Sequence, residues 1–134
     1  MSNHTIDRLN VDDSQVALLG YSPVSYVDDH VAEQGTPEHR VEHNGVAYYL
    51  TSSDQVARFQ ADPARYEPAF GGWCAFGMSL GKRFRVDPAS FEIVDERLMV
   101  FLNDLETDAR ALWNQGDPAQ LTSKAQQAWD GYAA

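Results

Sequence analysis

Two pairs of short segments that carry apolar residues are each joined by a short polar turn. The segments are residues 39–43 with 46–50, and residues 91–94 with 98–102. Such segments are typical of strands, and Asn44-Gly45 accepts the positive φ angles of a tight hairpin turn. With Asp95-Glu96 as the second turn, the pattern predicts two β-hairpins.

Helical signals surround the hairpins. Ser22-Pro23 and Asp117-Pro118 each combine an N-cap residue with proline at the first helical position. Apolar residues at helical spacing extend the predicted helices. The expected helices cover residues 23–28, a segment that begins after Ser52 or Ser53, a short turn at 63–66, and residues 105–114 and 119–132. The fold class is α+β, with two hairpins packed against short helices and closed by two C-terminal helices.

The chain length fits one domain. A chain of 134 residues is long enough to bury a core without disulfides or a structural metal. Residues 1–14 are polar and are expected to form a flexible N-terminal segment, so the domain covers residues 15–134.

Charge and hydropathy exclude two classes of partner. The chain carries 20 acidic and 10 basic residues, a net charge of −10, and its one basic run, Lys82-Arg83-Phe84-Arg85, is short. No nucleic-acid footprint is expected. No run of 18 apolar residues predicts a membrane span, and no N-terminal secretory signal is seen, so we expect a cytoplasmic protein. A mature exported form stays open.

The single cysteine is the main candidate for chemistry. Cys74 lies in the glycine-rich stretch 71–81, and Met78 follows it by four residues. If this stretch is helical, both sulfurs lie on one face, an arrangement of soft ligands that suits Cu(I). Two other readings stay open, namely a buried core thiol and a redox-active or nucleophilic thiol.

Histidine is the natural third ligand for such a copper site. His39 and His43 share one face of the first predicted strand but lie roughly 13 Å apart at the usual rise, so only one of them can join Cys74 and Met78. His30 is a further option. No sequence motif indicates a catalytic triad, a nucleotide loop or a calcium loop, so the sequence does not support enzymatic activity, and catalytic pairs distant in sequence stay open.

Several motifs follow one another in the order and spacing of a known family. They are Gly20-Tyr21-Ser22-Pro23-Val24-Ser25-Tyr26, the hairpin run Asn44-Gly45-Val46-Ala47-Tyr48-Tyr49-Leu50-Thr51-Ser52, Phe59, Asp62-Pro63 with Tyr66, Gly71-Gly72-Trp73-Cys74-Ala75 and Asp87-Pro88. Together they resemble the YHS domain, and the Gly-Gly-Trp-Cys-Ala motif resembles its longer, single-cysteine bacterial subgroup. The resemblance extends from about residue 17 to residue 132 and implies an α+β fold.

The chain departs from the metal-binding members of that family. The pattern of those members has one cysteine in the opening motif and two more after the hairpin. Ser25, Thr51 and Gln55 occupy these positions here. The resemblance therefore implies the fold, and it implies no thiolate site at the family's usual location.

The leading hypothesis is a small soluble protein that binds a soft metal, most simply copper, for handling or sensing the ion. Its expected ligands are Cys74, Met78 and one of His39 and His43. The alternatives are a non-catalytic structural or protein-interaction module, compatible with a homodimer, in which Cys74 is a core residue, and a redox-active thiol protein.

Overall fold

The computed structural model describes residues 9–12 and 14–133 and confirms a small α+β domain. Its strands are β1 (Thr36–His43), β2 (Val46–Leu50), β3 (Asp87–Val94) and β4 (Arg97–Phe101). Its α-helices are α2 (Pro23–Asp29), α3 (Ser53–Ala61), α4 (Pro63–Tyr66), α5 (Ala75–Ser79), α6 (Ala109–Gln115) and α7 (Pro118–Ala133). Two 3₁₀ turns, η1 (Leu18–Gly20) and η2 (Ala69–Gly72), complete the described elements.

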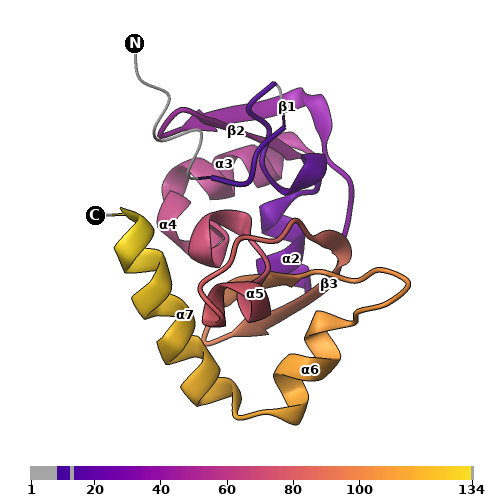
Figure 1. Ribbon diagram of the computed structural model, residues 1–134. Coiled ribbons are helices and arrows are strands. Elements are labelled where there is room, and N and C mark those ends of the chain that lie inside the picture. Colours follow the sequence, from indigo (N-terminus) through magenta and orange to yellow (C-terminus); the bar gives the residue numbers. More distant parts are fainter. Residues whose placement is uncertain (1–8, 13, 134) are drawn as a thin grey trace.

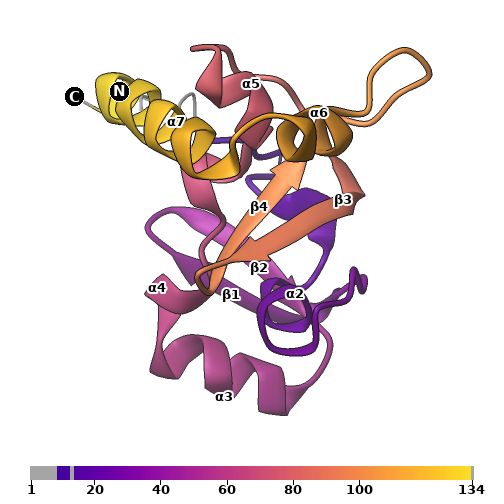
Figure 2. The ribbon, with the colours of Figure 1, turned by 90° about the horizontal axis from the view of Figure 1, so that it is seen from below.

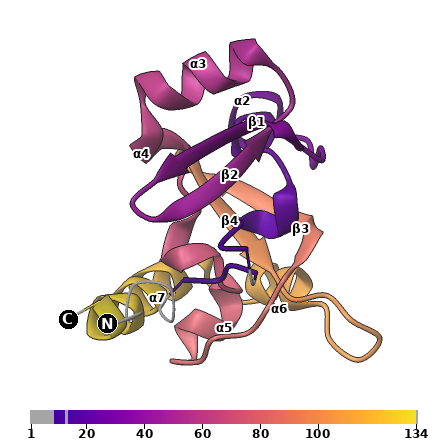
Figure 3. The same cartoon turned by 90° about the horizontal axis from the view of Figure 1, so that it is seen from above.

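The β1–β2 hairpin and α6 lie at opposite ends of the domain (Figure 1). Viewed from above, α3 lies at one end, followed by the β1–β2 hairpin, the β3–β4 hairpin, and finally α5, α6 and α7 (Figure 3). The view from below shows the same order (Figure 2). Each hairpin forms its own two-stranded antiparallel sheet. Within the described residues, no helix combines the length and apolar character that crossing a membrane requires.

Both hairpins turn where the sequence predicts. Asn44 and Gly45 have φ angles of 55° and 80°, and His43 pairs with Val46 across the turn. Two successive positive φ angles give the turn the twist that matches the strands. Asp95 and Glu96 also have positive φ angles, although neither is glycine. Both predicted hairpins are therefore confirmed.

Side-chain caps fix the start of the early helices. Ser22 Oγ accepts a hydrogen bond from Ser25 N at 3.1 Å, at the start of α2. Ser52 Oγ accepts one from Gln55 N at 3.2 Å, at the start of α3. Each cap satisfies one backbone N–H that has no partner inside its helix. The Ser22 cap and the choice of Ser52 over Ser53 follow directly from these contacts.

The predicted helix over residues 105–114 begins four residues later than expected. The carboxylate of Asp104 accepts hydrogen bonds from the backbone N–H groups of Glu106 and Thr107, which closes a local turn. Such a turn competes with helix formation. Asp108 then caps α6 by accepting from Ala111 N at 3.0 Å. Leu105, predicted to be an inward-facing residue, is instead fully exposed.

Strand β4 separates two hydrophobic cores. Leu98 and Val100 belong to the core beneath the first hairpin and α2. Met99 and Phe101 belong to the core beneath α5, α6 and α7. Successive side chains of a strand point to opposite faces. All four of these side chains are buried, so β4 is shared between both cores.

Part of the N-terminal segment contacts the domain. Residues 1–8 and 13 of the segment 1–14 lie outside the described residues. Asn10 is buried, and its backbone N–H donates to Gly71 O at 2.9 Å. Its side-chain amide donates to Gly72 O at 2.9 Å. Leu9 and Val11, on either side of it, pack against the first core.

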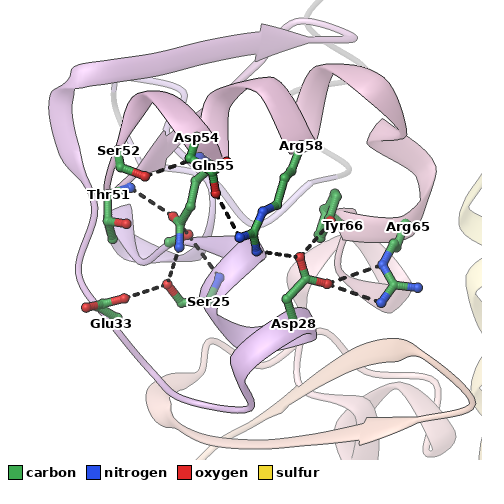
Figure 4. A network of polar contacts seen from close by, with 11 residues as sticks. Ser25, Asp28, Glu33, Thr51, Ser52, Asp54, Gln55, Arg58, Arg65 and Tyr66 are labelled. Carbon is green, nitrogen blue, oxygen red and sulfur yellow. Dashed lines mark hydrogen bonds and ion pairs between the residues drawn. The ribbon is translucent and has the colours of Figure 1, made fainter.

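A cluster of charged side chains ties α2 to α3 and α4. Asp28 accepts hydrogen bonds from Tyr66 Oη at 2.8 Å, from Arg65 Nη2 at 3.1 Å and from Arg58 Nη1 at 3.3 Å (Figure 4). Burial of the Asp28 carboxyl raises its pKa, but the hydrogen bonds from Tyr66 and the two arginines lower it by more. The net pKa lies below the ordinary value, so ionised Asp28 stabilises the fold.

We expect Asp28→Asn to lower the free energy of unfolding by about 2 kcal/mol at pH 7, because hydrogen bonds to a charged group are lost. A lowered folded-state pKa contributes stability above the unfolded pKa, and this contribution is lost as the pH falls through the folded value. The difference between wild type and variant should therefore shrink between pH 5 and pH 2. Urea unfolding measures it. Asp54→Asn, at an exposed i,i+4 pair with Arg58, is the control and should change stability little. A difference that stays constant over this pH range would contradict the assignment.

Candidate functional site

The two sulfurs singled out from the sequence lie on one short helix. Cys74 is the N-cap of α5, and its Sγ accepts a hydrogen bond from Gly77 N at 3.4 Å. Met78 N donates to Cys74 O at 2.9 Å. Both side chains are completely buried, in the second core, which also contains Met99. Only residues 75–79 of the stretch 71–81 are α-helical, with Cys74 at the N-cap and Met78 within the helix.

The two candidate histidines lie on β1 and have partners of other kinds. His39 Nδ1 is 3.1 Å from Thr36 Oγ1. His43 Nε2 is 2.7 Å from the Glu67 carboxylate, and its ring contacts Phe59 edge-on in the first core. Cys74 and Met78 lie in the second core, whereas His43 contacts a residue of the first core. Among the described residues, no group of three or more His, Cys, Asp or Glu side chains is placed to hold a metal ion.

The three positions at which the YHS resemblance places cysteines lie together, and hydrogen bonds join them. Gln55 Oε1 accepts from Thr51 N at 2.9 Å, and Gln55 Nε2 donates to Ser25 Oγ at 2.9 Å (Figure 4). Ser22 Oγ donates to the same Gln55 oxygen at 2.6 Å, and Ser25 Oγ donates to Glu33 Oε1 at 2.7 Å. The side-chain polar atoms of Gln55 thus have protein partners in a buried position.

This network has a structural consequence. Ser22, Ser25 and Gln55 are all buried, and Gln55 links β2, α2 and α3 through its contacts. Buried polar groups stabilise a fold only when their hydrogen bonds are made, as they are here. At the positions where metal-binding YHS members carry cysteines, this chain therefore has side chains that hydrogen-bond to one another.

The main cleft of the described structure lies elsewhere, where the tips of both hairpins approach η2 and α7. Its volume is about 560 Å³. Apolar and aromatic side chains form much of its wall, namely Leu9, Val11, Ala17, Val46, Tyr48, Ala69, Phe70 and Trp129. The ionisable residues that line it are His43, Asp62, Arg65, Glu67, Glu96 and Arg97. A cleft of this size and mixed lining is typical of sites for small organic ligands.

Gly71 shapes the wall of this cleft. A Cβ atom at this position would lie 2.6 Å from the ring of Trp129, and the φ angle of Gly71 is +65°. Glycine therefore allows the indole of α7 to lie directly against η2. Asn10 N donates to Gly71 O, which brings Leu9 and Val11 to the same wall.

One of the two arginines in the cleft is neutralised by carboxylates, since Arg65 pairs with Asp28 and Glu96. The imidazole of His43 contacts the carboxylate of Glu67. Burial and, to a lesser extent, the negative charge of Glu67 raise the pKa of Tyr48, so its hydroxyl stays protonated.

Arg97 is the other arginine of the cleft. Its guanidinium lies 5.2 Å from the centroid of the Phe70 ring and donates to Gln126 Oε1 at 3.3 Å. Within the described residues it pairs with no carboxylate, and it is therefore the arginine of this cleft that is positioned for an external anion. No sequence signal singles out Arg97, because only the fold reveals which arginines have partners.

Comparison with known proteins adds no assignment, since no protein-family model, curated protein or solved structure matches the chain. The resemblance to the YHS domain stays a prediction. Any functional assignment depends on the geometry of the cleft and of the buried sulfurs.

We expect Gln55→Ala to lower the free energy of unfolding by about 2–4 kcal/mol, because it removes one partner each from Ser22, Ser25 and Thr51 in a buried site. Gln120→Ala, at an exposed position of α7, is the matched control and should change stability by less than about 0.5 kcal/mol. Urea unfolding followed by circular dichroism measures both. Equal, small effects of the two substitutions would show that the network contributes little.

Proposed function

We propose that the protein is a non-catalytic binding module whose ligand site is the cleft between the hairpin tips and α7. The ligand is a small organic anion, a carboxylate on an apolar body. Arg97 supplies the charge that meets the carboxylate, and Phe70 and Trp129 supply the apolar contact. The observation that carries the proposal is Arg97, which lines the cleft without a carboxylate partner among the described residues while His43 and Arg65 have theirs.

The chemistry of the cleft supports binding without catalysis. The imidazole of His43 is engaged by Glu67, and the buried Tyr48 hydroxyl has a raised pKa. Among the described residues, no serine or cysteine lines the cleft to act as a nucleophile beside that imidazole. In this proposal Cys74 acts as a core residue, consistent with its complete burial at the start of α5.

A second candidate function is Cu(I) binding at the buried sulfurs. One observation favours it, namely that Cys74, Met78 and Met99 belong to the same hydrophobic core cluster. Thiolate and thioether sulfurs are the soft ligands that Cu(I) prefers. His39 and His43 lie on β1 and belong to neither this cluster nor α5, so the candidate set here consists of sulfurs alone.

We expect 2-naphthoate to bind the cleft about tenfold more tightly than the neutral 2-naphthamide, because only the carboxylate pairs with Arg97; this ratio corresponds to ~1.4 kcal/mol. Titrations followed by ¹H–¹⁵N correlation spectra, including the indole N–H of Trp129, measure both affinities. Arg97→Gln should abolish the preference. Arg110→Gln, which removes an exposed arginine of α6, should preserve it. If neither compound shifts the resonances of cleft residues, this choice of site is wrong.

We expect Cys74 to be protected from a thiol reagent such as DTNB in the native state and to react at the rate of unfolding, because its side chain is completely buried. The reaction is followed by absorbance with and without urea.

A Cu(I) titration of reduced protein against a competing chelator, with Zn(II) alongside, tests the second candidate function, Cu(I) binding at the buried sulfurs. One tight equivalent of Cu(I), lost in both Cys74→Ala and Met78→Leu, would establish copper binding instead. A metal site that persists in Cys74→Ser would exclude it.

A further inference from the structure

One side of strand β3 is an open sheet edge. Its other side pairs with β4, and among the described residues no further strand or isolated bridge adjoins β3 (Figure 2). Within the same part of the chain, no backbone hydrogen bond outside the β3–β4 ladder involves residues 91–94. Unpaired N–H and C=O groups along a strand form a template for pairing with another chain.

The register of the hairpin shows which backbone groups face outward. Val94 and Arg97 flank its turn, in which both φ angles are positive. In a two-residue hairpin of this kind the flanking pair exchanges backbone hydrogen bonds, and bonded and non-bonded pairs alternate from there along the strands. Phe91 and Ile93 therefore direct their N–H and C=O groups away from β4.

The side chains along this edge are largely apolar and partly exposed. Phe91 and Ile93 pack against the first core and Val94 packs against the second, yet each of residues 91–94 keeps part of its surface exposed. The two cores cover both faces of the strand, so the exposed part lies along the open edge.

Strand β1 shows how a sheet edge is protected in the same domain. It contains Pro37, and the same alternation, counted from His43, turns the backbone groups of Arg40 and Glu42 outward. Proline and charged residues at an edge oppose pairing with another chain. At β3 both outward-facing residues are apolar, and residues 91–94 contain no proline.

Glu92 adds a negative charge between the two outward-facing residues. Its Oε2 accepts hydrogen bonds from Arg110 Nε at 3.1 Å and from Asn114 Nδ2 at 2.6 Å, and its Oε1 has no partner among the described residues. A lysine or arginine opposite Glu92 on an added strand would lie next to this carboxylate. The net charge of −10 also attracts a basic segment.

A second copy of this chain fits the edge less well. Antiparallel pairing of two β3 strands through Phe91 and Ile93 sets Glu92 directly opposite its own counterpart, and like charges in this position are destabilising. Each copy also carries the net charge of −10. Charge complementarity therefore favours a basic partner.

We propose that residues 91–94, named the β3 edge, bind an extended segment of a partner protein, which adds a third strand to the β3–β4 sheet. The backbone of the segment supplies the hydrogen-bond partners that the outward groups of Phe91 and Ile93 lack. Its apolar side chains lie beside Phe91 and Ile93, and a basic side chain between them lies beside Glu92. The β3 edge shares no residue with the cleft, so the proposal does not depend on the ligand of the cleft.

The probe is the capped peptide acetyl-Lys-Val-Lys-Val-Lys-Val-Lys-amide, and amide hydrogen exchange of the protein is measured by NMR with and without it. We expect the N–H groups of Phe91 and Ile93 to exchange rapidly in the free protein and about tenfold more slowly at saturating peptide, because they then have acceptors. The N–H groups of Glu92 and Val94 bond to β4 and should be protected in both states.

Methylation of backbone nitrogens in the peptide separates strand pairing from charge attraction. The valines lie opposite Phe91 and Ile93, where the two residues of a pair exchange backbone hydrogen bonds. Methylation of the valine backbone nitrogens should therefore abolish binding. Methylation of the lysine backbone nitrogens keeps the same charge and should preserve it.

A matched pair of variants tests the charge. Glu92→Gln keeps an acceptor for Arg110 and Asn114 and should weaken peptide binding about threefold, because the charge opposite the lysine is lost. Glu42→Gln makes the same substitution on β1, where Glu42 pairs with Arg40, and should bind like wild type.

Three results would overturn the proposal. The first is equal binding of the peptide methylated at its valine nitrogens, and the second is equal affinity of the Glu92→Gln and wild-type proteins. The third is protection of the Phe91 and Ile93 N–H groups without peptide, which would show that the β3 edge is already covered. If that protection increases with protein concentration, the occupant is a second copy of the chain.

Discussion

The alternation of side chains along β4 is the constraint on which the architecture depends. Leu98 and Val100 complete one core, while Met99 and Phe101 complete the other. A slip of one residue in the pairing of β3 with β4 would exchange these sets. The register is fixed by contacts on both sides, including the bridge between Cys74 and Val100. Neither core can therefore form fully without the strand that also completes its neighbour.

Local signals made much of the fold predictable from the sequence. Asn44-Gly45 specifies a turn, and Ser22-Pro23 and Asp117-Pro118 specify helix starts, because each acts through its own backbone. The wrong prediction that the helix begins at Leu105 also has a local cause. Asp104 and Asp108 are both good capping residues, and the sequence pattern does not show which of them begins the helix.

The candidate sites were less predictable, because they depend on distant residues. The spacing of Cys74 and Met78 indicated a shared helix, which the structure has, but not that α5 packs with both side chains completely buried. The cleft is assembled from segments between Leu9 and Trp129 and has no local motif. Arg97 differs from other arginines only in what surrounds it. The positions of Ser25, Thr51 and Gln55 were, in contrast, singled out from the sequence, because the family resemblance compares them with cysteines.

Asn10 fastens one wall of the cleft to the domain. Its backbone N–H donates to Gly71 O, its side-chain amide donates to Gly72 O, and its side-chain oxygen accepts from Arg85. Its neighbours Leu9 and Val11 form part of the wall itself. A ligand of the proposed cleft that displaces this wall would have to break these contacts. Thermodynamic linkage then couples occupancy of the cleft to the docking of this part of the chain, so that each changes the equilibrium of the other by the same factor.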